Sequence, residues 1–140
     1  MIGRQPEDGD DEGSVLLLTI GYAVLAIALV LVCVDATSLH LAQKRTQAVA
    51  DAAALAGADG FVLTVAGGQP RAELTDAGVR AQAEDIVGVH PSAVLVDAGT
   101  PDGVSARVTV ASVWRPPVLT VFVPDGIGLE ATATSRTALR

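Results

Sequence analysis

Few side chains in this 140-residue chain are of the types that catalyse reactions or bind metals. Neither His40 nor His90 has a cysteine or carboxylate neighbour at metal-ligand spacing. Asp35 and His40 are five residues apart, whereas a helical ligand pair is four apart. The chain contains no nucleophile elbow, phosphate-binding loop or paired-cysteine motif. The sequence therefore predicts a protein that is not an enzyme and that binds no metal and no cofactor.

The other chemically capable residues have simpler interpretations. Glu84 and Asp85 are expected on a solvated helix face. Cys33 is the only cysteine, which excludes a disulfide within the chain, and we expect it to face lipid or a partner helix; acylation is the alternative. Asp35 follows the same apolar run. We interpret it as a membrane-boundary charge, which is either simply a boundary marker or paired with a basic residue of a neighbouring subunit.

The elements that must position these residues begin with an apolar run over residues 15–34, which contains no charged residue. A bilayer core about 30 Å thick is crossed by roughly 20 apolar residues in a helix. The run therefore predicts one transmembrane helix. A cleaved signal peptide would have a basic start and a shorter apolar stretch, whereas this start is acidic, so we favour an uncleaved anchor. A secreted soluble domain behind an atypical signal peptide is the alternative.

Helical composition continues beyond the run. Residues 35–58 contain no proline, and small apolar side chains recur every three or four residues, so we expect one helix from about Gly13 to Ala58. Five small residues along it are predicted to pack against another helix, two in the span and three beyond it: Thr19, Ala23, Ala53, Ala56 and Gly57. Two alternatives stay open for this seam. It packs either against partner subunits or against the chain's own C-terminal part.

Several features of this helix occur in a fixed order. The apolar run ends in Val34-Asp35, the basic pair Lys44-Arg45 follows, and the run Asp51-Ala52-Ala53-Ala54-Leu55-Ala56-Gly57 comes next. The segment from about Gly13 to Gly60 resembles the N-terminal part of TadG-like proteins of tight-adherence (Flp) pilus systems. The short members of that family are close to TadE-like minor pilins, and the sequence fits either group.

The resemblance implies a single-pass inner-membrane protein with a cytoplasmic N-terminus and an extracytoplasmic C-terminus. It also implies that the partners, besides the membrane, are other pilin-like or Tad assembly subunits; copies of the chain itself are a further alternative. Arg4 alone precedes the span, whereas Lys44 and Arg45 follow it, which weakly favours the opposite orientation. We follow the resemblance because so small a difference in charge is a poor predictor of orientation.

The remainder predicts a small α+β unit. We expect a helix over residues 72–87, a strand over 92–97, a turn at 99–103, and two strands over 104–114 and 129–139 that pair with each other. Strict alternation in the strand 104–114 places six residues on one apolar face: Val104, Ala106, Val108, Val110, Ser112 and Trp114. The apolar run 118–123 is either a buried strand or a membrane-proximal patch.

The predicted organisation has four parts: an acidic segment 1–14, a transmembrane helix 15–34, a projecting Ala-rich helix 35–60, and an extracytoplasmic α+β unit 61–140. The fold class is α+β and membrane-anchored, with a pilin-like layout of a long helix, a small helix and an antiparallel sheet. The net charge is −7 and no basic patch occurs, so nucleic acid is not an expected partner. The expected function is that of a minor pilin-like or pilus-assembly component; a single-span envelope protein outside any pilus is the alternative.

Overall fold

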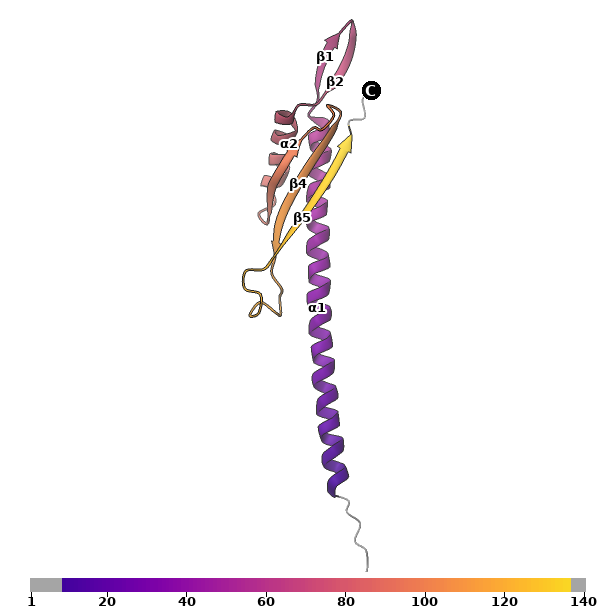
Figure 1. Cartoon of the computed structure of the whole chain (residues 1–140), viewed down its shortest axis with the longest axis vertical. Coiled ribbons are helices and arrows are strands. Elements are labelled where there is room, and N and C mark those ends of the chain that lie inside the picture. Colours follow the sequence, from indigo (N-terminus) through magenta and orange to yellow (C-terminus); the bar gives the residue numbers. More distant parts are fainter. Residues whose placement is uncertain (1–8, 137–140) are drawn as a thin grey trace, which may run out of the picture.

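A computed structural model describes residues 9–136, with side chains from Gly13 onward, as one long helix that carries a small α+β unit at its C-terminal end (Figure 1). The elements follow in the order α1 (Gly9–Asp59), β1 (Val62–Ala66), β2 (Gln69–Glu73), α2 (Asp76–Gly88), β3 (Ala93–Gly99), β4 (Ser105–Trp114) and β5 (Ile127–Arg136). The predicted α+β class is confirmed. Most of the predicted acidic segment 1–14 and the end of the predicted strand 129–139 lie outside the described residues.

Helix α1 is continuous over 51 residues, which at 1.5 Å per residue is about 75 Å. This confirms the expected helix, and the reason is compositional, because Ala and Leu dominate and proline is absent from it. Gly60 ends the helix, and its N–H donates to the carbonyl of Gly57 at 3.3 Å. The N-terminal half of α1 extends away from the rest of the chain (Figure 1).

Strands β3, β4 and β5 form an antiparallel sheet in that order. Strand β5 pairs with β4 along its whole length, from Ser105 opposite Arg136 to Trp114 opposite Ile127. The predicted pairing of the last two strands is therefore confirmed. Gly103, with a φ of 74°, allows the turn between β3 and β4 that the sequence also predicts.

The core lies between one face of this sheet and the two helices. Helix α1 packs against β4, β5 and α2, and α2 also packs against β3. The apolar face predicted for the strand 104–114 is buried at its centre, where Ala106, Val108 and Val110 are fully covered. Towards the ends of the strand, Ser112 and Trp114 are half-buried and Val104 is exposed. The helices supply mostly small side chains to this core: Val49, Ala50, Ala53, Ala54, Ala58, Val79, Ala83 and Val87. Small side chains let the two helices pack closely against each other and against the sheet, so three strands are enough to cover the helices on that side.

The segment between the helices differs from the expectation. Helix α2 begins at Asp76, with Thr75 as its N-cap, and not at residue 72. The preceding residues form a hairpin of β1 and β2, in which Val62 pairs with Glu73, and the sequence reasoning assigned no strand there. Gly67 and Gly68 both have positive φ, as a two-residue hairpin turn requires. Because the hairpin uses residues 72 and 73 as strand, the helix starts later.

The apolar run 118–123 is not a buried strand. It forms turns and bends in the loop between β4 and β5, and Val121 and Phe122 are 87% and 80% exposed. Only Pro116, at the start of this loop, is fully buried. The strand alternative is therefore wrong, and the alternative of a membrane-proximal patch stays a prediction.

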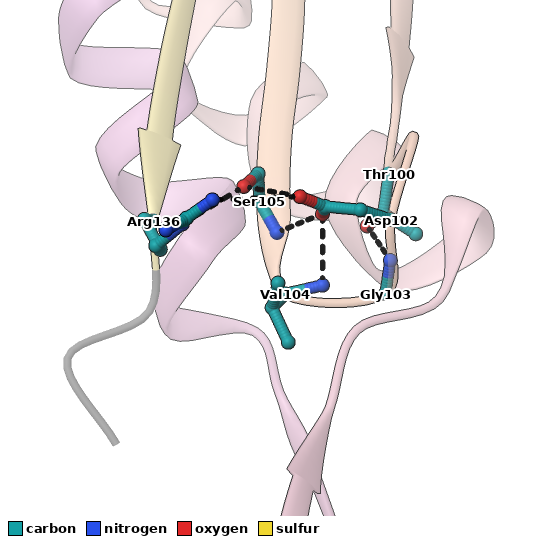
Figure 2. A network of polar contacts seen from close by, with 6 residues as sticks. All are labelled: Thr100, Asp102, Gly103, Val104, Ser105 and Arg136. Carbon is teal, nitrogen blue, oxygen red and sulfur yellow. Dashed lines mark hydrogen bonds and ion pairs between the residues drawn. The ribbon is translucent and has the colours of Figure 1, made fainter. Parts of the chain in front are cut away.

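A polar network closes the loop between β3 and β4 (Figure 2). The Oδ1 atom of Asp102 accepts hydrogen bonds from the backbone N–H groups of Val104 at 3.1 Å and Ser105 at 2.6 Å, and Oδ2 accepts from the Ser105 hydroxyl at 2.9 Å. Arg136 lies 3.9 Å from Oδ2. The Val104 and Ser105 hydrogen bonds, helped by the Arg136 charge, lower the pKa of Asp102 below its ordinary value of 3.8.

We expect this network to make part of the fold's stability dependent on pH. Because the pKa of Asp102 is lower in the folded chain, its contribution is present above pH 3.8 and is lost as the pH falls through the lowered value. Asp102→Asn should therefore flatten the loss of stability between neutral and acidic pH. Urea unfolding of both proteins in detergent, followed by Trp114 fluorescence at each pH, measures this. Equal acid sensitivity of the two proteins would show that the carboxylate contributes nothing.

Candidate functional site

The first half of α1 presents an unbroken apolar surface. It is the one helix in the described part of the chain that is long and apolar enough to cross a membrane, and none of its most apolar 18 residues is buried. The two packing residues predicted there, Thr19 and Ala23, are both exposed. The Thr19 hydroxyl donates to the carbonyl of Val15 at 2.8 Å, so it carries no unsatisfied polar group into an apolar surrounding. Packing of Thr19 and Ala23 against a partner helix stays a prediction.

The second half of α1 is covered on one side by the chain's own α+β unit. Ala53 is fully buried, and a Cβ atom built on Gly57 would lie 2.9 Å from Cγ1 of Val79 and 3.3 Å from Cβ of Ala106. These two residues therefore pack within the chain, as in the alternative where the C-terminal part covers the seam. Ala56 is half-buried beside them, and its packing against a partner helix stays a prediction.

A different face of the same helix is open. Ala48, Ala52 and Leu55 are exposed, at spacings of four and three residues, so they form one stripe on the helix. The stripe borders a groove of ≈ 450 Å³ between α1, the residues that follow α2, and the end of β4. Ala48 and Ala52 line this groove together with Arg45 and Trp114. Small side chains of α1 thus line part of the groove, next to the larger Arg45 and Trp114.

Three polar contacts attach the C-terminal end of β4 and the loop after it to α1. Ser112 and Thr46 share a hydrogen bond of 2.6 Å between their hydroxyls. The indole Nε1 of Trp114 donates to the Ser38 hydroxyl at 3.1 Å. The backbone N–H of Val118 donates to Oδ1 of Asp35 at 3.2 Å. As the chain runs from Ser112 to Val118, its partners on α1 move toward the N-terminus of that helix. The loop after β4 therefore lies beside the helix turn at Asp35.

Asp35, predicted as a membrane-boundary charge, has a structural role in this arrangement. Its side chain is only 6% exposed, and its second oxygen, Oδ2, is buried without a hydrogen-bond partner among the described residues. The loop that starts at Pro116 covers it. A salt bridge from Asp35 to a neighbouring subunit stays a prediction, and it would require this loop to move aside.

Sequence reasoning missed the partners of these contacts. Ser112 and Trp114 were expected on the apolar face of the strand 104–114, but neither was matched to a position on the helix, and Ser38 was not singled out. A signal was present, because Ser38 lies close to the line of small residues that continues through Thr46 and Ala53. Small polar residues on the seam mark the part of the helix that is covered by the end of a strand. Their partners on β4 could not be assigned without knowing which strand crosses the helix there.

Of the two histidines, His90 lines the groove beside the stripe. His40 is exposed on α1, and Nδ1 of His90 is 2.9 Å from the carbonyl of Ile86. Within residues whose side chains are described, no three His, Cys, Asp or Glu side chains gather as a metal site would require. The arrangement of residues on α1 supports packing and anchoring.

Residues 13–60 match the Tad family, described as Flp pilus-assembly TadE/G-like. The match covers about a third of the chain and coincides with α1 and its terminating glycine. No curated protein and no solved structure matches the chain. The resemblance inferred from the residues is thus confirmed for the N-terminal segment.

Proposed function

We propose that this chain, whose N-terminal segment is TadE/G-like, is a membrane-anchored minor pilin-like subunit or assembly component of a Flp (tight-adherence) pilus. The observation that carries the proposal is that the family match and one continuous helix have nearly the same limits. The first half of that helix has the length and composition to cross a bilayer. The second half holds a small α+β unit beside it, so a partner could contact helix and sheet together.

We propose further that the N-terminus is cytoplasmic and that the α+β unit lies outside the inner membrane. The family resemblance supports this orientation, and it outweighs the single extra basic residue that follows the span. A reporter active only outside the cytoplasm, fused after Arg140, should give strong signal, whereas a reporter active only in the cytoplasm should give background signal. The reverse result would exclude the pilus assignment and leave the positive-inside count as the better guide.

The open stripe of α1, formed by Ala48, Ala52 and Leu55, is the surface we propose for contact with other pilin-like subunits or a second copy. It borders the groove of ≈ 450 Å³, and its small side chains allow a second helix backbone to come close. This proposal shifts the expected contact away from Ala53 and Gly57, which the chain itself covers. It keeps the predicted mechanism, assembly by helix packing.

Site-specific crosslinking in cells that assemble the pilus tests this surface. Ala52→Cys and Thr134→Cys, each in a Cys33→Ala background, place one exposed thiol on the stripe and one on the open face of β5. After labelling with a benzophenone maleimide, light should crosslink the Ala52 position to pilus subunits several-fold more than the Thr134 position. Equal crosslinking from both positions, despite equal labelling, would contradict an interface on the stripe. Crosslinks to envelope proteins outside any pilus would instead support the alternative function.

A further inference from the structure

The loop between β4 and β5 displays apolar side chains on a well-defined turn. Val121 and Phe122 are the two most exposed large apolar residues in the described chain, at 87% and 80%. The loop is nevertheless hydrogen-bonded, because the N–H groups of Phe122 and Val123 both donate to the carbonyl of Leu119, at 2.9 and 3.0 Å. The Thr120 hydroxyl also donates to the carbonyl of Pro116, which is fully buried. The side chains are therefore held outward and are not part of a collapsed coil.

The position of this loop along α1 is fixed by contacts. The Val118 N–H is bonded to Asp35, the first charged residue after the apolar run 15–34. The Trp114 indole is bonded to Ser38, one helix turn further on. In Figure 1 the loop hangs below the sheet, beside α1, on the side of the N-terminal half of that helix. The loop thus reaches the level at which the proposed span leaves the bilayer.

The charges around the loop suit a bilayer surface. Residues 116–124 include no charged side chain, and Arg115 and Asp125 flank them. Trp114 lies at the same end of the sheet, and aromatic rings with one polar atom are enriched at membrane interfaces. Apolar side chains at a bilayer surface are covered by the boundary between headgroups and acyl chains, and a neighbouring cation such as Arg115 can face lipid phosphate.

We infer that the loop around Val121 and Phe122 inserts into the bilayer surface beside the span, as a second membrane contact. The occupant is lipid, because the exposed apolar patch is held next to the end of the apolar first half of α1, and that half is itself exposed all round. The inference rests on the proposed function, in which residues 15–34 cross the membrane. Its consequence is that the loop fixes the height of the α+β unit, and of the open stripe of α1, above the bilayer.

Quenching of a fluorescent label by brominated lipid measures the contact between the loop and the bilayer in the full-length protein. Three single-cysteine proteins carry an environment-sensitive nitrobenzoxadiazole label at the native Cys33, or at Val121→Cys or Val94→Cys in a Cys33→Ala background. Cys33 reports the span, and Val94, which is 64% exposed on the outer face of β3, is the matched surface control. Each protein is reconstituted into vesicles of phosphatidylcholine and phosphatidylglycerol, with or without lipid brominated near the headgroup.

We expect brominated lipid to quench the Val121 label at least about three-fold more than the Val94 label, with a blue-shifted emission. If Cys33 is quenched and the Val121 label behaves like the Val94 label, the loop is not a membrane contact and the proposal is overturned, while the span stands. If none of the three labels is quenched, the span itself fails, and with it the anchor on which the proposed function depends. Val121 is exposed, so its replacement leaves the fold intact and the comparison valid.

Discussion

Replacing Gly57 with leucine should strongly destabilise the α+β unit. The cause is a clash inside the chain's own core, and not a lost contact with another subunit. The new Cβ would lie 2.9 Å from Cγ1 of Val79 and 3.3 Å from Cβ of Ala106, and three further carbons would have to follow it into the core. Overpacking a filled core typically costs about 1–3 kcal/mol, and we expect a value at or above the top of that range. Leucine has a higher helix propensity than glycine, but this offsets less than about 1 kcal/mol of the loss in stability. Urea unfolding in detergent, followed by Trp114 fluorescence, gives the change in free energy of unfolding.

Ala52→Leu on the same helix is the matched control. Ala52 is exposed, so the larger side chain should change the free energy of unfolding by no more than about 0.5 kcal/mol. In pilus-assembling cells, however, it should reduce association, because it fills the open stripe of α1. A Gly57→Leu protein as stable as the parent would mean that α1 and α2 do not pack at this point. Gly57 would then be free to contact a partner helix, as the sequence predicts.

Gly126→Ala should be the most damaging change in the loop between β4 and β5. Gly126 has a φ of 74°, and an added Cβ would lie 2.6 Å from the carbonyl oxygen of Trp114 and 2.8 Å from Cγ1 of Val113. The left-handed conformation costs an alanine about 1–2 kcal/mol, and the clash with fixed backbone adds about 1–3 kcal/mol. We therefore expect a loss of about 3 kcal/mol, together with faster proteolysis of the loop, because its return into β5 is distorted.

Gly103→Ala separates the two causes of that loss. Gly103 also has a φ of 74°, but an added Cβ would meet nothing within 4 Å. Its substitution should cost only the conformational part, about 1–2 kcal/mol. Urea unfolding of both variants under the same conditions gives the difference, which is the steric cost at Gly126. If the two variants lose equal stability, the close approach of the loop to the end of β4 is absent, and the placement of the loop beside Asp35 would need revision.

The local elements of this protein were predictable because short-range physics specifies them. A long run without proline, rich in Ala and Leu, strongly favours one helix, and α1 extends from Gly9 to Asp59, close to the expected limits. Alternation over residues 104–114 specified both the strand and its buried face, because successive side chains of a strand point to opposite sides. The hairpin of β1 and β2 was missed, although Gly67-Gly68 after an apolar run is a hairpin signal.

The candidate site depended on longer-range information. The sequence determined that α1 carries a seam of small residues and that Asp35 follows the apolar run. It did not determine what covers the seam, because alanine and glycine accept any close neighbour, from the same chain or from another. Only the tertiary structure decided that the chain itself buries Ala53 and Gly57, with α2 and β4 against Gly57, and leaves the stripe at Ala52 open. It likewise decided that an apolar loop far along the chain meets Asp35, since that contact joins residues 83 positions apart and no local pattern encodes it.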